Sequence, residues 1–311
     1  MNGSRYAYLE RICELVAQGE DLIIVSADYA APVLDGFRIN YPSRFLSVGI
    51  AEQNLLAVSS GLAMCGKRVI AYGCAPFPLV RAFDQLKNTV SMMQIPINLV
   101  VAGIGFGVPE WGATHYNIDD MALVRTIPNV KIITPSDNVM GRALADYALV
   151  NETPAYVRFD KYAEGIIYDK VTFDFERGFS VLCEGGDVVV ITCGYFVERV
   201  LHLAENWKKN GVNAKIIDLY GYPFDEEALC SVIGASPVIT IEEHILSGGM
   251  GAAVLEMLHD KLKGNRLKKL GVTFDGCYPQ TSGSKEYYWE KFGLSDEAIT
   301  SSLYAFLEKG L

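Results

Sequence analysis

Short runs of apolar and β-branched residues alternate with segments of helical periodicity along the first half of the chain. Six runs have the length and composition of buried strands: residues 22–28, 44–49, 68–73, 96–103, 131–137 and 155–159. Apolar side chains recur at helical spacing over 51–64, and Ser136 or Asp137 is suited to cap a helix over 136–150. Buried strands separated by helices predict a parallel sheet that is covered on both faces.

The same alternation returns in the second half of the chain. Strand-like runs occupy residues 187–194, 213–221, 237–244 and 268–274, and helical patterns occupy 196–210 and a segment from about Gly248. The intervening residues, from about 160 to 178, are polar, charged and rich in turn formers, which is typical of a linker. We therefore predict an α/β fold with two doubly wound, mostly parallel-sheet domains, at 1–165 and 181–311, joined by a linker at 166–180.

The composition narrows the classes of function. The 311 residues are 50 % hydrophobic and 21 % charged, as expected of a globular chain long enough for two domains. The formal net charge of −10 argues against nucleic acid as a partner, because such binding needs a concentrated basic face. The N-terminus has no apolar signal core, and no run is long enough to span a membrane. Seven cysteines without a CxxC pair favour a reduced, cytoplasmic protein.

Several common catalytic motifs are missing from the sequence. There is no GxGxxG after a strand, no P-loop, no GxSxG and no HExxH. Of the four histidines, His202 and His259 lie in helical patterns with charged neighbours. His115 and His244 instead follow strand-like runs, where open α/β sheets bind their ligands.

Three stretches combine polar groups with glycine or aromatic residues after strand-like runs: SVGIAEQN (47–54), YGCAPFPLVRAFDQLKN (72–88) and AGIGFGVPEWGATHYNID (102–119). Taken alone, Glu52 in the first is explained by the positive end of a helix dipole. The aromatic residues of the second are explained by packing in a core. The third is either a flexible surface loop or, given its length and its Trp111 and His115, a loop that lines a site.

Taken together, these stretches resemble the pyrimidine-binding domain of the transketolase family of thiamine-diphosphate enzymes. The family's glycine–hydrophobic–x–glutamate pattern is here Gly49-Ile50-Ala51-Glu52. Its R-A-[FY]-[DE]-Q segment corresponds to residues 81–85, and its G-x-x-x-[DE]-G-P-T-H loop to residues 107–115. IEEHILSGGMGAAV (241–254) resembles the signature of the family's C-terminal domain, so the resemblance runs from about residue 5 to the end of the chain.

The resemblance implies a binding site for thiamine diphosphate. Glu52 corresponds to the glutamate that hydrogen-bonds the ring nitrogen of the cofactor's aminopyrimidine. A carboxyl group in a water-poor pocket is able to stay protonated near neutral pH and to donate that proton, whereas the cofactor supplies the electron sink. Phe77 and Phe83 correspond to the apolar wall beside the pyrimidine. The resemblance places three further residues at the cofactor: Asp28, Ile50 and Arg81.

The resemblance also implies a substrate site, with departures from the family pattern. His115 corresponds to the histidine that faces the reacting carbon, and Arg158 to an arginine that binds a substrate phosphate. Trp111 stands where transketolases carry an acid that reads a substrate hydroxyl, and Ala113 replaces a proline. An indole cannot accept a hydrogen bond as a carboxylate does. We therefore expect altered specificity, toward a specialised sugar or an unusual pair of sugar phosphates.

One part of the family's active site has no counterpart in this sequence. Single-chain members carry a preceding domain with a G-D-G…N motif, which holds a metal ion and through it the cofactor diphosphate, with oxygen ligands suited to Mg²⁺. The chain has no such motif, so it is either truncated or half of a split enzyme, and its start at a plausible Met1 and helix favours the split enzyme. We therefore expect half of a split enzyme, with the diphosphate and metal site on an N-terminal-type partner subunit, and a heterotetramer as the assembly.

Two other functions remain open at this stage. RAFDQ and TIPNVKIITPSD lean slightly toward a 2-oxoacid dehydrogenase beta subunit or a deoxyxylulose-phosphate synthase-like enzyme, which use pyruvate or another 2-oxoacid in place of a ketose donor. A non-catalytic subunit that kept the fold is the other alternative. The presence of Glu52, Phe77 and His115 argues against it, because a scaffold has no need for an acid at that position.

Overall fold

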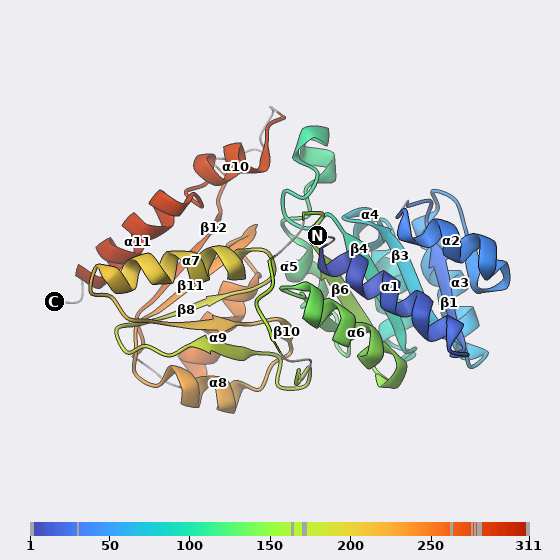
Figure 1. Cartoon of the computed structure of the whole chain (residues 1–311), viewed down its shortest axis with the longest axis horizontal. Coiled ribbons are helices and arrows are strands. Elements are labelled where there is room, and N and C mark those ends of the chain that lie inside the picture. The colour runs from blue at the N-terminus through green and yellow to red at the C-terminus, as the bar shows by residue number, and fades with distance from the viewer. Residues whose placement is uncertain are drawn as a thin grey trace.

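The computed structural model describes residues 3–29, 31–162, 165–169, 173–261, 264–274, 276, 278 and 282–308. These residues form two α/β lobes that lie side by side, each built around one sheet (Figure 1). Both sheets are mostly parallel, which confirms the fold class predicted from the alternation of apolar strands and helical segments. No helix among the described residues is long and apolar enough to cross a membrane.

The first sheet has the strand order β10-β5-β6-β4-β3-β1-β2. Its parallel strands are β1 (Leu22–Ser26), β2 (Phe45–Ser47), β3 (Arg68–Cys74), β4 (Ile97–Ala102), β5 (Lys131–Ile133) and β6 (Ala155–Phe159). Strand β10 (Gly221–Tyr222) comes from the second half of the sequence and pairs antiparallel with β5. Every residue of β1, β4 and β6 is buried, as expected of central strands covered on both sides.

Helices cover both faces of the first sheet. Helices α1 (Ser4–Ala17), α2 (Val33–Asn40) and α6 (Asn138–Val150) pack on one face. The other face carries α3 (Glu52–Met64), α4 (Phe77–Val80), a π-helix (Gln85–Ser91) and α5 (Asp120–Val124). Asp137 caps α6 as predicted, because its carboxylate accepts a 2.8 Å hydrogen bond from the Met140 N–H.

The second sheet has the order β12-β11-β8-β9-β7. Its strands are β7 (Ser180–Cys183), β8 (Val188–Thr192), β9 (Ala214–Asp218), β11 (Val238–Ile245) and β12 (Leu267–Val272), and only the edge pair β7–β9 is antiparallel. Helices α7 (Phe196–Lys209), α10 (Lys285–Lys291) and α11 (Asp296–Glu308) pack on one side of it. Helices α8 (Glu226–Ile233) and α9 (Met250–Lys261) pack on the other side (Figure 1).

The structure differs from the sequence prediction in its short and peripheral elements. The elements that the sequence pattern missed include α2, α5, β7, β10, α8, α10 and α11. Two predicted strands, 44–49 and 131–137, are shorter, because the chain leaves the sheet after Ser47 and Ile133. The residues beyond these points belong to the loops at the carboxyl edge of the sheet. That edge gathers the segments after β1, β2, β3, β4 and β6, and it positions the candidate site.

Candidate active site

Helix α3 begins at Glu52, shortly after the end of β2. The Glu52 side chain is only 6 % exposed, and its Oε1 accepts a 2.8 Å hydrogen bond from Nη1 of Arg81. Arg81 follows α4 and is about half exposed, so the ion pair joins a buried acid to the surface. The other carboxylate oxygen, Oε2, forms no hydrogen bond with the described residues, which leaves it available to a ligand at the helix N-terminus.

A line of aromatic contacts continues from this ion pair. The Arg81 guanidinium lies over the Phe77 ring, 4.2 Å from its centroid. The Phe77 ring meets the His115 ring edge-on at 5.0 Å, and His115 meets Trp111 in the same way at 4.9 Å. Five of the residues predicted from sequence therefore lie in one continuous path, although they come from three separate segments of the chain.

Trp111 and His115 belong to a loop between β4 and α5 that is closed at its base. Gly105 and Asn117 exchange two backbone hydrogen bonds of 2.9 Å, which hold the two arms of the loop together. At the tip, two 3₁₀ turns, Pro109–Trp111 and Ala113–His115, meet at Gly112, whose φ of +76° suits glycine. The turns present His115 toward Phe77 and leave Trp111 56 % exposed.

The surroundings of His115 favour the neutral form of its imidazole. Burial lowers its pKa below the ordinary histidine value, and the nearby positive charge of Arg81 lowers it further. Thr114 Oγ1 lies 3.0 Å from the His115 Nδ1. A neutral imidazole has one donor and one acceptor nitrogen, so His115 is able to donate a hydrogen bond to a substrate oxygen while Thr114 orients the ring.

Three further predicted cofactor residues lie at the same edge of the sheet, outside this contact path. Asp28 follows β1 in the left-handed region, with φ of +53°, and is exposed. Ile50 is 74 % exposed between β2 and α3, whereas Phe83 is half-buried and packs against the core. No hydrogen bond or ring contact joins the three to Glu52 within the described part of the chain. Asp28 and Ile50 are accessible for contact with another molecule.

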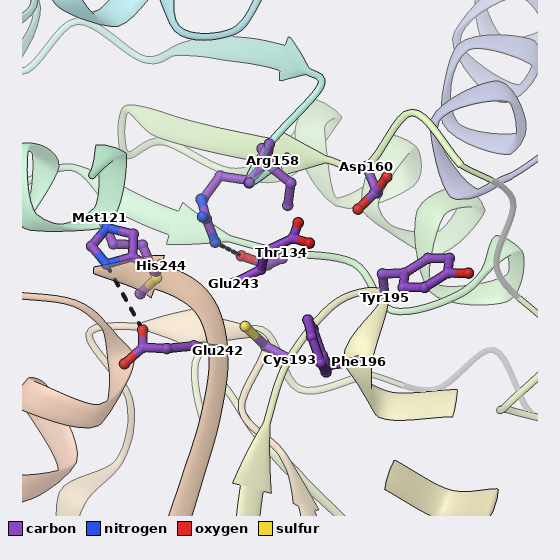
Figure 2. Close-up of a pocket in the computed structure, with 12 residues that line it drawn as sticks. Met121, Thr134, Arg158, Asp160, Cys193, Tyr195, Phe196, Glu242, Glu243 and His244 are labelled. Carbon is purple, nitrogen blue, oxygen red and sulfur yellow. Dashed lines mark hydrogen bonds and ion pairs between the residues drawn. The ribbon is translucent and has the colours of Figure 1, made fainter. Parts of the chain in front are cut away.

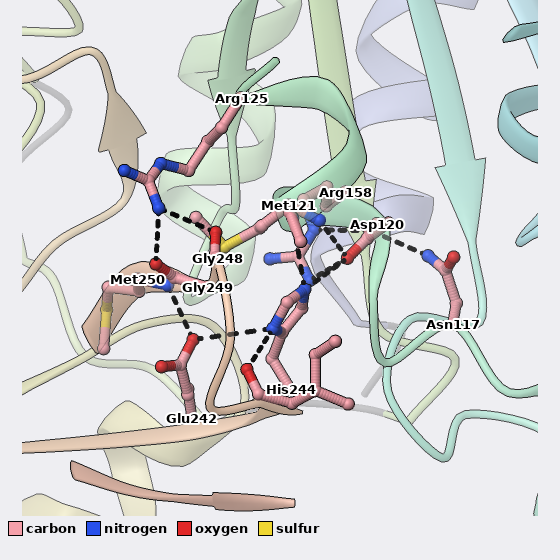
Figure 3. Close-up of polar contacts among 12 residues, drawn as sticks. Asn117, Asp120, Met121, Arg125, Arg158, Glu242, His244, Gly248, Gly249 and Met250 are labelled. Atoms are coloured by element: carbon pink, nitrogen blue, oxygen red, sulfur yellow. Dashed lines mark hydrogen bonds and ion pairs between the residues drawn. The ribbon is translucent and has the colours of Figure 1, made fainter. Parts of the chain in front are cut away.

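Arg158, predicted to bind a substrate phosphate, has internal partners in the structure. This residue of β6 is 3 % exposed, and its guanidinium forms a bidentate pair with Asp120, with distances of 2.7 and 2.8 Å (Figure 3). Its Nη1 donates to Thr134 Oγ1 at 3.0 Å (Figure 2). All three groups are buried, and the fork of Arg158 is occupied by an internal ion pair, whereas its contact with a substrate phosphate stays a prediction.

The sequence drew attention to His244 as a possible ligand position, but the structure gives it a role between the domains. His244 is 1 % exposed, and its Nδ1 lies 2.7 Å from the Ile245 carbonyl (Figure 3). The Ala122 N–H of α5 donates to its Nε2 at 3.4 Å. Burial lowers the pKa of His244 to about 4, so it is neutral near pH 7. His244 therefore fastens β11 to the first domain.

A small polar cavity lies at the same junction. Its volume is about 30 Å³, and its lining includes Arg158, Glu242 and Cys193 (Figure 2). Glu242 accepts hydrogen bonds of 2.7 and 2.8 Å from the Met250 and Gly251 N–H groups at the start of α9. Burial raises the pKa of Glu242 to about 7. The cavity has room for ordered water and is too small for a sugar.

Two family models match the chain. The model described as "Transketolase, pyrimidine binding domain" matches residues 3–163, and "Transketolase, C-terminal domain" matches residues 179–299. The chain belongs to the transketolase family. This confirms the resemblance inferred from the motifs around Glu52, Arg81 and His115.

Transketolase relatives of similar length cover almost the whole chain. A putative transketolase C-terminal section of Methanocaldococcus jannaschii is 31 % identical over 99 % of this chain and 97 % of its own length. An apulose-4-phosphate transketolase subunit of Phocaeicola vulgatus is 29 % identical over 99 % of both chains. A solved structure described as a split gene transketolase, inactive beta4 tetramer, has a TM-score of 0.87 at 29 % identity and 99 % coverage of both chains.

A longer relative matches as well. The 1-deoxy-D-xylulose-5-phosphate synthase of Syntrophus aciditrophicus is 28 % identical over 96 % of this chain, which spans 46 % of that protein.

The residues of this transketolase-family chain fit one end of thiamine diphosphate. Glu52 has a buried carboxylate, one oxygen of which forms no hydrogen bond with the described residues. The half-buried ring of Phe77 packs against Arg81, the ion-pair partner of Glu52. These groups suit the hydrogen-bonding edge and the flat face of an aminopyrimidine. In the described ranges, no cluster of three or more His, Cys, Asp or Glu side chains is placed to hold a metal ion.

Proposed function

We propose that this chain is the C-terminal-type subunit of a split transketolase-like enzyme, which transfers a two-carbon ketol unit between sugars with thiamine diphosphate. The observation that carries the proposal is the contact path from Glu52 through Arg81 and Phe77 to His115. It unites a buried acid, an aromatic wall and a neutral imidazole at the carboxyl edge of a parallel sheet. A subunit that served only as a scaffold would not need these groups in contact.

Each side chain of the path has a definite task. Thiamine diphosphate, when bound, supplies the electron sink for the carbon–carbon chemistry. Glu52 binds the aminopyrimidine ring nitrogen and holds a proton there, and Phe77 and Phe83 exclude water from that edge. His115 donates a hydrogen bond to the substrate oxygen on which negative charge develops. Arg81 contacts both the Glu52 carboxylate and the Phe77 ring and holds them in a fixed position relative to each other.

The partner supplies the other end of the cofactor. We assign the diphosphate and Mg²⁺ to an N-terminal-type subunit, because neither a G-D-G…N motif in the sequence nor a metal cluster among the described residues serves them here. The exposed Asp28 and Ile50 face that subunit, and two copies of each chain form a heterotetramer. The enzyme acts in carbohydrate metabolism in the cytoplasm, where the cysteines that the structure describes as free remain reduced.

The substrate is a sugar phosphate or a specialised sugar. The relative in Phocaeicola vulgatus is named for apulose-4-phosphate. In this chain the exposed Trp111 stands beside His115 and below Lys161, whose Nζ lies 5.6 Å from the indole centroid. This flat apolar surface replaces a carboxylate that would read a hydroxyl, so we expect a preference for donors or acceptors that lack that hydroxyl or carry it elsewhere.

Calorimetric titration of thiamine diphosphate with Mg²⁺ tests the proposal. We expect weak binding to the chain alone and tight binding to its mixture with the separately encoded partner, because the diphosphate is then anchored. Glu52→Gln in the mixture weakens binding and abolishes most activity, whereas Glu20→Gln, at the opposite end of β1, serves as the control. Equal affinity with and without the partner would contradict the split site, and no binding in either case would indicate a non-catalytic subunit.

A second candidate is an enzyme of the deoxyxylulose-phosphate synthase type, or a 2-oxoacid dehydrogenase beta subunit. The synthase type is favoured by the match to the synthase of Syntrophus aciditrophicus, which covers nearly all of this chain. Product analysis of the assembled enzyme separates the two candidates. Ketol transfer from a ketose donor supports the leading proposal, and consumption of pyruvate with release of carbon dioxide supports the alternative.

A further inference from the structure

Lys285, the first residue of α10, is a buried lysine outside the contact path described above. It is 1 % exposed, and its ammonium group contacts two carboxylates, those of Asp160 and, at 3.4 Å, Glu243. Three aromatic rings surround the same ammonium group, with centroids at 4.5 to 5.5 Å: Tyr162, Tyr195 and Trp289. A lysine is rarely buried so completely, and here two carboxylates and three aromatic rings compensate the charge of its ammonium group.

The two carboxylates belong to different domains. Asp160 follows β6 of the first sheet, whereas Glu243 lies in β11 of the second, and both reach the domain junction (Figure 2). Lys285 therefore joins the second domain to the carboxyl edge of the first sheet, where the candidate site lies. The lysine is needed at this position, because removing it would leave two buried carboxylates without a compensating positive charge.

Glu243 holds the base of the loop that carries His115. Its Oε2 accepts a 3.0 Å hydrogen bond from the Phe106 N–H. The carboxylate also packs so closely on Gly105 that a Cβ at that residue would lie 1.9 Å from Oε2. Gly105 in turn forms the paired backbone hydrogen bonds with Asn117 that close the loop. The position of Glu243 thus sets the position of both arms of the loop.

Asp160 restrains the tip of the same loop through Lys161, the next residue in the chain. The Lys161 ammonium group lies 3.6 Å from Glu110 Oε1 and 5.6 Å from the Trp111 ring centroid. The backbone here is fixed because Asp160 accepts a 2.9 Å hydrogen bond from the Tyr162 N–H as well as the bond from Lys285. The tip residues Glu110 and Trp111 therefore rest against a segment that Lys285 restrains.

Helix α10 adds an aromatic contact to the ionic one. Phe106 stacks on Tyr288 at 4.6 Å, and the hydroxyl groups of Tyr116 and Tyr288 are hydrogen-bonded. Phe106 and Tyr116 lie on the two arms of the loop, each next to the Gly105–Asn117 closure. The second domain thus contacts the loop at its base on both arms.

We propose that Lys285 is a positioning residue, through which the second domain sets the placement of His115 and Trp111 over the cofactor edge. The inference rests on the proposed function for its catalytic consequence, but its structural part concerns this chain alone. The second domain then serves catalysis without contributing a side chain to the contact path: it orders the loop that carries two of the path's residues.

Hydrogen exchange of the full chain tests this inference without a partner or a cofactor. Lys285→Met and, as a milder variant in case the first does not fold, Glu243→Gln are compared with Lys215→Met. Lys215 is the control, because it is a lysine of β9 in the second domain that bonds the Val232 carbonyl and lies 3.4 Å from Glu184, outside the loop. We expect exchange of the amides over 105–117 to rise by at least about tenfold in the first two variants, with α3 and α6 unchanged.

The outcomes separate the proposal from a purely structural role and from the proposed function. Faster exchange throughout the second domain, with the loop no more affected than the rest, would overturn the proposal, as would unchanged exchange over 105–117 in a folded Glu243→Gln. In the assembled enzyme we expect Glu243→Gln to lower kcat by about tenfold or more while Lys215→Met does not. Loop loosening in an enzyme that never shows ketol transfer would refute the proposed function and leave the positioning role intact.

Discussion

The guanidinium of Arg81 bonds the Glu52 carboxylate at 2.8 Å and lies 4.2 Å from the Phe77 ring centroid. One side chain thus connects the acid at the start of α3 with the aromatic residue at the start of α4. Its planar group is suited to both contacts at once, since it offers donors in its plane and an apolar face above it. The candidate site is therefore partly ordered before any partner or cofactor arrives.

Glu52→Gln is expected to lower kcat of the assembled enzyme by about 10²- to 10⁴-fold, because the amide cannot supply the proton that a carboxyl group provides. Steady-state kinetics at saturating cofactor measure the effect. Arg81→Lys keeps the charge but loses the planar stacking on Phe77, and we expect a smaller loss, chiefly in cofactor affinity. Full activity of Glu52→Gln would remove Glu52 from the chemistry.

Trp111→Asp is expected to shift substrate preference toward common ketose and aldose phosphates, because it restores a carboxylate where transketolases use one. The ratio of kcat/KM for a common donor to that for the best donor of the unaltered enzyme should rise by about tenfold or more. Trp111→Phe keeps an aromatic ring beside His115 and serves as the control. An unchanged ratio in Trp111→Asp would show that the residue does not determine specificity.

Arg158→Met is expected to lower the free energy of unfolding by about 3 to 5 kcal/mol, because it leaves the fully buried Asp120 without its bidentate partner. Adding Asp120→Asn should recover part of that loss, since the unpaired charge is then removed. Urea unfolding of the two single variants and the double variant measures the coupling. Purely additive losses would show that the ion pair contributes nothing beyond its separate residues.

We expect the burial of His244 to make the protein less stable in acid. Its pKa falls from an ordinary value of 6.5 to about 4 on folding, so the unfolded chain binds the proton more tightly. Stability is therefore fully present above pH 6.5 and is lost as the pH falls toward 4, by up to about 3 kcal/mol. His244→Gln keeps an acceptor for the Ala122 N–H and should lack this loss.

Other groups at the junction titrate in the opposite sense. Burial raises the pKa of Glu242 and of Asp218 to about 7, so their contribution to stability falls as the pH rises toward 7. The informative quantity is thus the difference in unfolding free energy between the unaltered protein and His244→Gln across the acid range. A difference that does not change with pH would contradict the neutral state assigned to His244.

The central strands and most of the contact path were predictable from local sequence. The runs that became β1, β3 and β4 are largely apolar, so their burial on both faces follows from composition. The run that became β6 is apolar apart from Arg158. The path residues Glu52, Phe77 and His115 were found because each follows such a run, and because the family motifs name them. Sequence spacing could not show that Arg81 pairs with Glu52, which requires the packing of α4 against α3.

The internal pairing of Arg158 and the burial of Lys285 were missed for the same reason. Arg158 is separated from Asp120 by 38 positions, and Lys285 from Asp160 by 125. In a local pattern each is simply a charged residue, and KEYYWEK resembles an exposed helix. Their burial depends on long-range partners that compensate the charge, and no periodicity records such partners.

The short strand β10 gives the two halves of the chain a shared boundary. Gly221 and Tyr222 lie beyond the linker in sequence, yet they complete the sheet of the first half by pairing with Ile132 and Ile133. The Gly221 N–H also bonds the Gly178 carbonyl at 2.8 Å, so the crossing segment is tied to the same edge. A chimera that joins the first domain of one relative to the second domain of another at the linker would thus have a mismatched edge in the first sheet. A chimera in which residues 178–222 are exchanged together with the first domain would keep the native pairing of that edge.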